Sequence, residues 1–179
     1  MSGERQRSPG SLRQDRSVMI VRATRKLLDR IGPGEASEDQ STTLLGDWYA
    51  TALPWRPRQV ALLMSDRTLL PLAMPLAPAA TLLARFPDHL TGMLKALQVP
   101  ADVIEQELAH MRPCTLAATN NRSRVGSLNE FTFLADAHRQ SHPEIDLLDL
   151  SLRLSRVPCS PLYKRHISPD RELAALLAH

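Results

Sequence analysis

The most regular pattern along the chain is a helical spacing of apolar residues from position 79 to position 111. Leucine, methionine, isoleucine and phenylalanine recur there at intervals of three and four, which places their side chains on one face of a helix. Proline lacks the N–H that a helix interior requires. We therefore predict that Pro87 divides the run into two helices and that Pro100 begins a further helix.

Shorter apolar runs bounded by polar residues or prolines are typical of β-strands. Four segments have this character: residues 18–21, 59–65, 69–76 and 114–119. The second and third segments are joined by polar residues, which indicates a hairpin. Pro71 and Pro75 cannot donate to a strand ladder, so the strand that contains them is expected at an edge of the sheet.

The remaining apolar spacing predicts further helices, one of which, at residues 44–53, includes the aromatic residues Trp48 and Tyr49. These helices are expected at residues 24–31, 44–53, 125–138, 145–154 and 170–177. Ser123 is the expected N-cap of the third. Strands and helices do not alternate strictly, which favours an α+β fold. We expect a small antiparallel or mixed sheet of three to four strands, with several helices packed mainly on one face.

Charge is concentrated at the N-terminus and indicates two regions. Residues 1–17 carry four arginines against two acids, so of the net charge of +3 only +1 remains for residues 18–179. The first region has almost no apolar residues and is expected to be a disordered basic tail. Residues 18–179 are expected to form one domain. Met19 is an alternative start, which leaves open whether residues 1–18 are translated.

Nothing in the sequence predicts export or membrane insertion. The basic N-terminus lacks the apolar segment of a secretory signal. The longest uncharged stretch, residues 69–84, is shorter than a membrane span and is interrupted by prolines. Cys114 and Cys159 are too few for a disulfide framework and are interpreted as reduced thiols. We expect a cytoplasmic protein without a membrane partner.

The densest polar cluster comprises Asn120, Asn121, Arg122 and Ser123, with Ser127 one turn further on. It lies where a strand is expected to pass into a helix. N–H groups at a helix start can hold an anion, over which Arg122 would close. Alternatively, the asparagine and serine side chains cap the helix. The glycine spacing of a phosphate-binding loop is absent.

A second candidate is the pair Asp47 and Trp48, beside Tyr49. A carboxylate next to aromatic rings in a pocket is suited to general acid–base catalysis, and Trp48 could line such a pocket. The alternative is a pair of core aromatic residues with an aspartate that caps a helix. Asp47 is therefore only a candidate catalytic base.

Other combinations of reactive residues lack a recognisable motif. His138 and His142 have the spacing that lets two imidazoles share a metal, but Arg139 stands where zincins have glutamate. Cys159 near His166 is flanked by prolines, and Ser127 lacks a nucleophile-elbow motif. We expect no metal site and no cofactor.

Three stretches, residues 19–28, 45–50 and 119–130, together resemble a bacterial family of uncharacterised proteins, catalogued as a domain of unknown function. The resemblance extends from about residue 19 to residue 161. It implies a bacterial, single-domain, intracellular protein and assigns no catalytic residue. In that family the chain usually starts near the methionine that corresponds to Met19.

Three functions follow from these observations. The first is a binding or interaction module with an anion site at Asn120, Asn121, Arg122 and Ser123, whose partner is a small anionic ligand or a protein. The second is an enzyme acting on a phosphorylated or anionic substrate, which requires Asp47 and Asn121 to meet in one pocket. The third is a nucleic-acid-binding accessory protein that uses residues 1–17 with Lys164 and Arg165. The lack of a catalytic motif favours the first.

Overall fold

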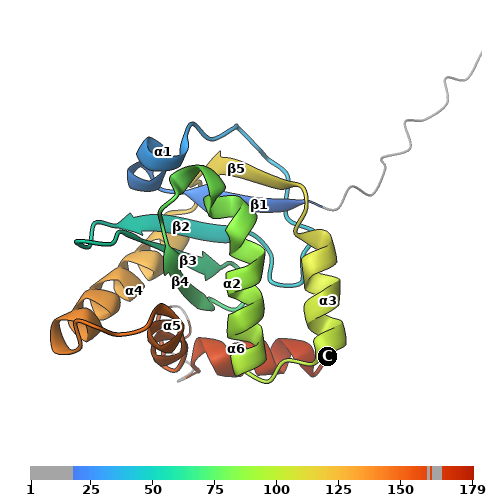
Figure 1. Ribbon diagram of the computed structural model, residues 1–179. Coiled ribbons are helices and arrows are strands. Elements are labelled where there is room, and N and C mark those ends of the chain that lie inside the picture. Colours follow the sequence, from blue (N-terminus) through green and yellow to red (C-terminus); the bar gives the residue numbers. More distant parts are fainter. Residues whose placement is uncertain (1–17, 161, 163–166) are drawn as a thin grey trace, which may run out of the picture.

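A five-stranded mixed sheet lies at the centre of the structure (Figure 1). The computed structural model describes residues 18–160, 162 and 167–179. The strand order is β4-β3-β2-β1-β5, in which β1 is parallel to β2 and β5, whereas β3 is antiparallel to β2 and β4. The strands are β1 (Met19–Ala23), β2 (Trp48–Leu53), β3 (Val60–Ser65), β4 (Pro71–Pro75) and β5 (Cys114–Ala118).

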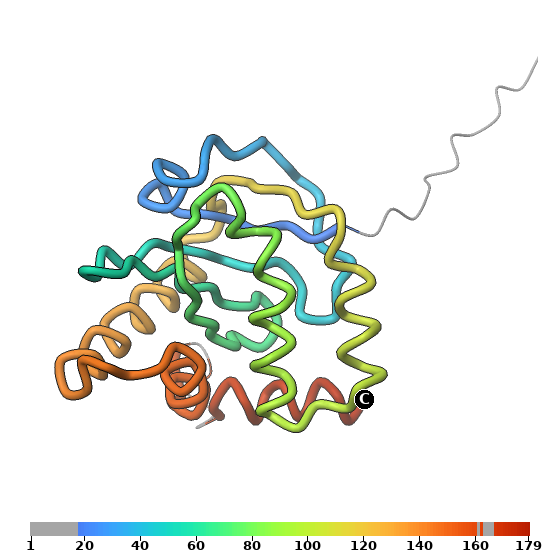
Figure 2. The backbone as a smooth tube through the Cα atoms, viewed as in Figure 1, coloured from blue at the N-terminus to red at the C-terminus, as the bar shows by residue number. Residues whose placement is uncertain are grey.

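Helices cover both faces of this sheet. On the first face pack α1 (Arg25–Ile31), α2 (Leu82–Ala96), α3 (Ala101–His110) and α6 (Pro169–Leu177). On the second face pack α4 (Arg122–Ser141) and α5 (Leu147–Ser155). Figure 2 shows α2 and α3 side by side, with α6 running past the turn that joins them. None of the described helices has the length and apolar character needed to cross a bilayer.

The α+β class, the first strand, the hairpin and the strand that begins at Cys114 are confirmed. The prediction of three to four strands is wrong, because residues 48–53 form β2 and not a helix. This strand lies between β1 and β3, and its residues are buried on both faces of the sheet. A strand covered on both sides has no alternation of polar and apolar residues, which is the pattern that would have revealed it.

The predicted helix break at Pro87 is also wrong. Helix α2 continues through Pro87, which is its sixth residue and lies buried in the core beside Phe86 and Leu90. The proline removes one backbone hydrogen bond near the start of the helix. The apolar packing of the neighbouring residues outweighs that loss.

The outer edge of β4 is closed to further strands. Pro71 and Pro75 have no N–H to offer, as the sequence predicted. The N–H of Ala73, which points the same way, donates to Ser151 Oγ on α5 at 2.8 Å. Every outward-facing donor position of this strand is therefore absent or already bonded.

A buried glutamate links α3 to the irregular chain before β2. Glu107 is 2% exposed and accepts hydrogen bonds from the N–H groups of Leu44, at 2.6 Å, and Leu45, at 3.2 Å. Burial raises the pKa of Glu107 above its ordinary value of 4.5, and the two backbone donors oppose that rise. This carboxyl group is consequently a site where pH acts on stability.

We expect the free energy of unfolding of the wild type to fall, relative to that of Glu107→Gln, as the pH rises above about 4.5. The folded state holds the Glu107 proton to a higher pH than the unfolded chain does. Raising the pH from the ordinary pKa of glutamate through the higher pKa of the folded state therefore favours unfolding. Denaturant titrations at a series of pH values measure the difference. Glu105→Gln, at an exposed position of the same helix, is the control, and a pH-independent difference for Glu107→Gln would contradict the expectation.

Candidate functional site

An arginine in the middle of an apolar strand begins the site. Met19, Val21 and Ala23 of β1 point into the core on the first face of the sheet. Because side chains alternate along a strand, Arg22 points to the second face. Its neighbour across the β1–β2 pair is Tyr49, whose side chain packs on that same second face.

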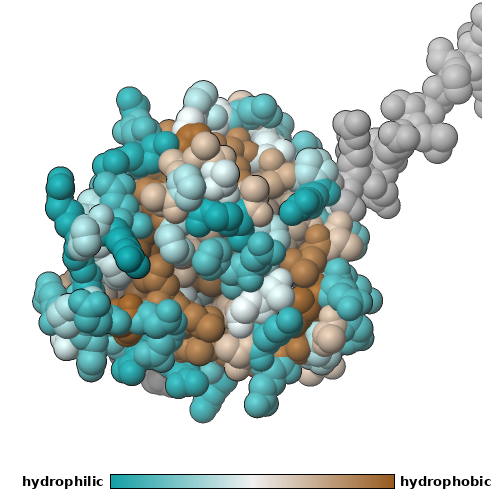
Figure 3. All heavy atoms as spheres, viewed as in Figure 1, coloured by the Kyte–Doolittle hydropathy of each residue, from teal (hydrophilic) through white to brown (hydrophobic). Residues whose placement is uncertain are grey.

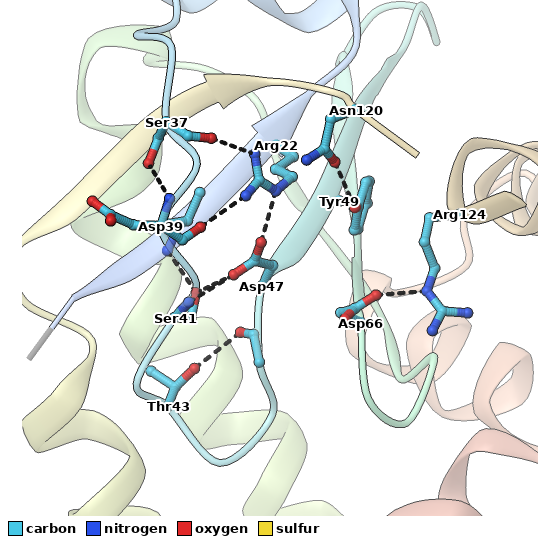
Figure 4. Close-up of polar contacts among 12 residues, drawn as sticks. Arg22, Ser37, Asp39, Ser41, Thr43, Asp47, Tyr49, Asp66, Asn120 and Arg124 are labelled. Carbon is cyan, nitrogen blue, oxygen red and sulfur yellow. Dashed lines mark hydrogen bonds and ion pairs between the residues drawn. The ribbon is translucent and has the colours of Figure 1, made fainter. Parts of the chain in front are cut away.

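Arg22 forms a buried ion pair with Asp47, which immediately precedes β2. The Nε of Arg22 is 2.7 Å from Asp47 Oδ2, and the two side chains are 4% and 10% exposed. A charge buried to this degree is tolerated only with a close partner of opposite sign. The pair therefore fixes the start of β2 against β1, as Figure 4 shows.

The same two side chains hold the segment between α1 and β2. The terminal nitrogens of Arg22 donate to the carbonyl oxygens of Ser37, at 3.3 Å, and Asp39, at 3.0 Å. Asp47 Oδ1 accepts from both the N–H and the Oγ of Ser41, at 2.8 and 2.7 Å. A segment without helix or strand thus has a defined shape over the second face of β1 (Figure 4).

Gly46 makes the turn that leads into Asp47. Its φ is +76°, a region that favours glycine. A Cβ at this position would also approach the Arg67 side chain to 3.1 Å. Arg67 in turn donates to the carbonyl of Leu44 at 3.1 Å, so the turns before β2 and after β3 support each other.

The third segment of the site follows β5. Asn120 Oδ1 accepts a hydrogen bond from the Tyr49 hydroxyl at 3.0 Å. The amide nitrogen of Asn120 makes no hydrogen bond to any other described residue. The pKa of Tyr49 is raised, first by burial and then by the nearby Asp66 carboxylate. Asp66 is itself paired with Arg124 at 2.6 Å, and the positive charges of Arg22 and Arg124 partly oppose the rise in the Tyr49 pKa. Because its pKa is raised, Tyr49 is a neutral hydrogen-bonding group.

Asn121 is the N-cap of α4, which corrects the prediction of Ser123. Its Oδ1 accepts from the N–H groups of Ser123, at 3.0 Å, and Arg124, at 3.2 Å. An asparagine in this role satisfies the donors that a helix start leaves free. Two of the N–H groups that an anion would use are therefore already bonded within the chain.

These segments enclose a pocket of about 290 Å³, which we call the polar pocket. Asp47 and Asn121, which are 74 positions apart in the sequence, both line it. This is the convergence that the enzyme hypothesis required. Other lining residues include Arg22, Ser41, Tyr49 and Asn120.

The charges around the polar pocket nearly cancel. Arg22 and Arg67 line it, together with Glu38, Asp47 and Asp66. The additional acid is offset by Arg124, which pairs with Asp66 from α4. The pocket therefore presents hydrogen-bonding groups without a strong field of either sign.

Four of the residues proposed from sequence do not line the polar pocket. Trp48 points to the first face of the sheet, where its ring meets that of Phe86 edge-on at 4.9 Å. Arg122 is exposed and does not line the polar pocket. Ser127 is buried, and its hydroxyl donates to the carbonyls of Ser123 and Ser160. Ser123 contributes its backbone N–H to the cap.

Sequence reasoning did not select Arg22, Ser41 or Tyr49 as site residues. A signal existed for Arg22, because an arginine inside the apolar run Met-Ile-Val-Arg-Ala needs a buried partner once the run is a strand. No comparable signal marked Ser41, which lies in an irregular segment. Tyr49 was hidden by the assignment of its segment to a helix.

The other combinations of reactive residues gain no support. Within the described parts of the chain, no group of three histidine, cysteine or acidic side chains is placed to hold a metal. Burial raises the pKa of the Cys159 thiol to about 12, which suppresses the thiolate that a nucleophile needs. His166, Lys164, Arg165 and residues 1–17 lie outside the described residues.

A protein-family model described as "Domain of unknown function (DUF6933)" matches residues 20–172 of the chain. The matched region contains β2 to β5 in full and all of the residues that line the polar pocket. Comparison with curated proteins and with solved structures gave no match.

Proposed function

Because the chain belongs to the DUF6933 family, whose description assigns no activity, we propose a function from the site itself: the protein is a binding module whose polar pocket holds a small, uncharged or zwitterionic polar ligand. The observation that carries this proposal is the convergence of three distant segments on one pocket. Arg22 lies on β1, Asp47 immediately before β2 and Asn120 just after β5.

Hydrogen-bonding groups remain available in the polar pocket after the internal contacts are formed. The amide nitrogens of Asn120 and Asn121 donate to no other described residue, since only their oxygens are engaged. Asp66 Oδ2 and the Glu38 carboxylate offer acceptors in the same pocket. A ligand that carries both donors and acceptors complements this arrangement, because each of these groups can then form a hydrogen bond to it.

The charge balance argues against a strongly anionic ligand. The fixed charges that line the polar pocket sum to −1, and the Asp66–Arg124 pair brings the sum to zero. The capping role of Asn121 also removes two N–H donors that the anion hypothesis needs. A volume of about 290 Å³ lies near the lower limit of small-molecule sites, which suits a ligand the size of an amino acid or a monosaccharide.

The enzyme alternative keeps one supporting observation, the presence of Asp47 and Asn121 in one pocket. Against it, Asp47 Oδ1 accepts two hydrogen bonds from Ser41 and Oδ2 is bound by Arg22. A catalytic base needs an oxygen within reach of the substrate proton. Asp47 would have to release one of these partners first, so we favour binding.

The proposal includes the cellular setting that the sequence analysis expected, a bacterial cytoplasm. The ligand now proposed is uncharged or zwitterionic, whereas the sequence analysis expected an anionic one. Binding of a protein partner or a nucleic acid would use surfaces other than the polar pocket.

Thermal shift assays with three ligand panels test the proposal. We expect amino acids or monosaccharides to raise the melting temperature of the full chain by several degrees at saturation, because they bind the folded state only. Phosphorylated compounds of similar size should raise it less. Asn120→Asp retains the acceptor for Tyr49 and removes the free amide donor, so it should weaken binding of the best ligand by about tenfold.

Asn129→Asp is the matched control, since it makes the same substitution at an exposed position of α4. Calorimetric titration of both variants with the best ligand separates a local effect from a change in overall charge. Equal affinities in the two variants, or stabilisation by the phosphorylated panel alone, would refute the proposed ligand class.

A further inference from the structure

A second cavity lies far from the polar pocket. It encloses about 760 Å³ and shares no lining residue with the polar pocket. Asn121 lines the polar pocket and Arg139 lines the second cavity, and these residues lie at opposite ends of α4. At a rise of 1.5 Å per residue they are about 27 Å apart. We call this second cavity the amphipathic cavity.

The floor of the amphipathic cavity is apolar. It is formed where α2 and α5 diverge beside the edge strand β4. Figure 3 shows apolar side chains at the surface over β3 and β4, in the area that these helices border. The apolar lining residues include Val60, Leu72, Ala73, Ile145, Leu147 and Leu148. Leu148 is 37% exposed, one of the two large apolar side chains that are markedly exposed among the described residues.

One wall of the amphipathic cavity carries three arginines, Arg56, Arg58 and Arg139. Arg139 lies over the Trp55 ring at 4.9 Å and donates to the carbonyl of Arg56 at 2.6 Å. This contact brings the end of α4 to the β2–β3 loop and gathers the positive charges there. None of the three forms an ion pair with a described residue.

The acidic residues of the cavity offset its arginines, which disfavours a ligand with several negative charges. Asp88 on α2, Glu144 and Asp146 bring the fixed charges of the described lining residues to zero. The Asp146 carboxylate is occupied as the N-cap of α5, where it accepts from Leu148 and Asp149. His89 adds no charge at neutral pH, because burial and then Arg85 lower its pKa.

We propose that this cavity binds a small amphipathic anion, with its ring or chain on the apolar floor and its acidic group against Arg56, Arg58 and Arg139. The volume is typical of a small-molecule site. The apolar floor supplies binding energy through burial of the ligand's body. Unpaired guanidinium groups are suited to a carboxylate or sulfonate, which they hold by charge-assisted hydrogen bonds. This site is independent of the polar pocket.

Gly92 offers a direct test, since it lines the cavity from the middle of α2. A Cβ added there meets nothing within 4 Å, and Gly92 borders the cavity, so we expect a larger side chain to occupy part of it. Gly126 in α4 is a matched control, because a Cβ at that position also meets nothing within 4 Å and the residue lines neither cavity. Replacing a glycine inside a helix favours the helix in both cases.

The experiment measures the fluorescence of 1-anilinonaphthalene-8-sulfonate with the full chain, and its displacement by decanoate and by decyltrimethylammonium. We expect decanoate to displace the dye and the cation to compete at least about tenfold less well. Gly92→Phe should weaken dye and decanoate binding by about tenfold, whereas Gly126→Phe should leave both unchanged.

A second variant keeps the test valid if Gly92→Phe does not fold. The double substitution Arg56→Gln and Arg58→Gln alters exposed side chains and should remove the preference for decanoate over the cation. Absence of dye binding to the wild type, equal binding by the Gly92→Phe and Gly126→Phe variants, or equal competition by decanoate and the cation would each overturn the proposal.

Discussion

Replacement of Asp47 by alanine is expected to lower the free energy of unfolding by about 3–5 kcal/mol. The substitution leaves the Arg22 guanidinium, which is 4% exposed, without its carboxylate partner. It also removes the acceptor for the N–H and hydroxyl of Ser41. Urea denaturation of the full chain, followed by circular dichroism, measures the loss.

A double-mutant cycle separates the ion pair from the other contacts of Asp47. Arg22→Met combined with Asp47→Leu removes both charges and should cost less than Asp47→Ala alone, because no unpaired charge stays buried. The exposed pair Arg25–Asp29 provides the control, since Asp29→Ala should change stability by about 1 kcal/mol or less. Strictly additive effects of the Arg22 and Asp47 substitutions would show that the pair does not act as described.

Trp48→Ala is the second substitution with a large expected effect, again a loss of about 3–5 kcal/mol. Trp48 is fully buried on the first face of the sheet and packs edge-on against Phe86. The alanine variant would leave a large cavity next to α2. The change in the urea midpoint at constant slope measures it.

Trp48→Phe should lose much less stability than the alanine variant. The Nε1–H of Trp48 is buried and has no hydrogen-bond partner among the described residues, so phenylalanine removes an unsatisfied donor while keeping a ring in the core. Trp55→Phe is the comparison, because Trp55 Nε1 donates to Asp136 at 2.6 Å. If Trp48→Phe were as costly as Trp48→Ala, the edge-on packing described for this ring would be incorrect.

The sequence predicted the elements whose pattern is local. The β3–β4 hairpin was recognisable from two apolar runs around a polar turn, and the edge position of β4 followed from Pro71 and Pro75. Strand β2 was missed because the helices packed on the two sides of the sheet bury both of its faces. Pro87 was misread because its cost depends on its place in the helix and on the core around it.

The site was predicted only in part, because some of the elements that position its residues were not recognised in the sequence. Asn120, Asn121 and Asp47 do line the polar pocket. The two asparagines follow β5, which was visible in the sequence, whereas Asp47 precedes β2, which was assigned to a helix. Trp48 was placed with Asp47 as a neighbour, yet alternation along β2 sends the two adjacent side chains of Trp48 and Tyr49 to opposite faces. Such a reversal cannot be seen until the strand itself is recognised.

The hydrogen bonds from Leu44 and Leu45 to Glu107 give α3 a mechanical connection to the polar pocket. Gly46 and Asp47 follow these two residues directly and line the pocket. These two hydrogen bonds therefore fix the turn at Gly46 and Asp47 relative to α3, although the helix itself does not line the pocket.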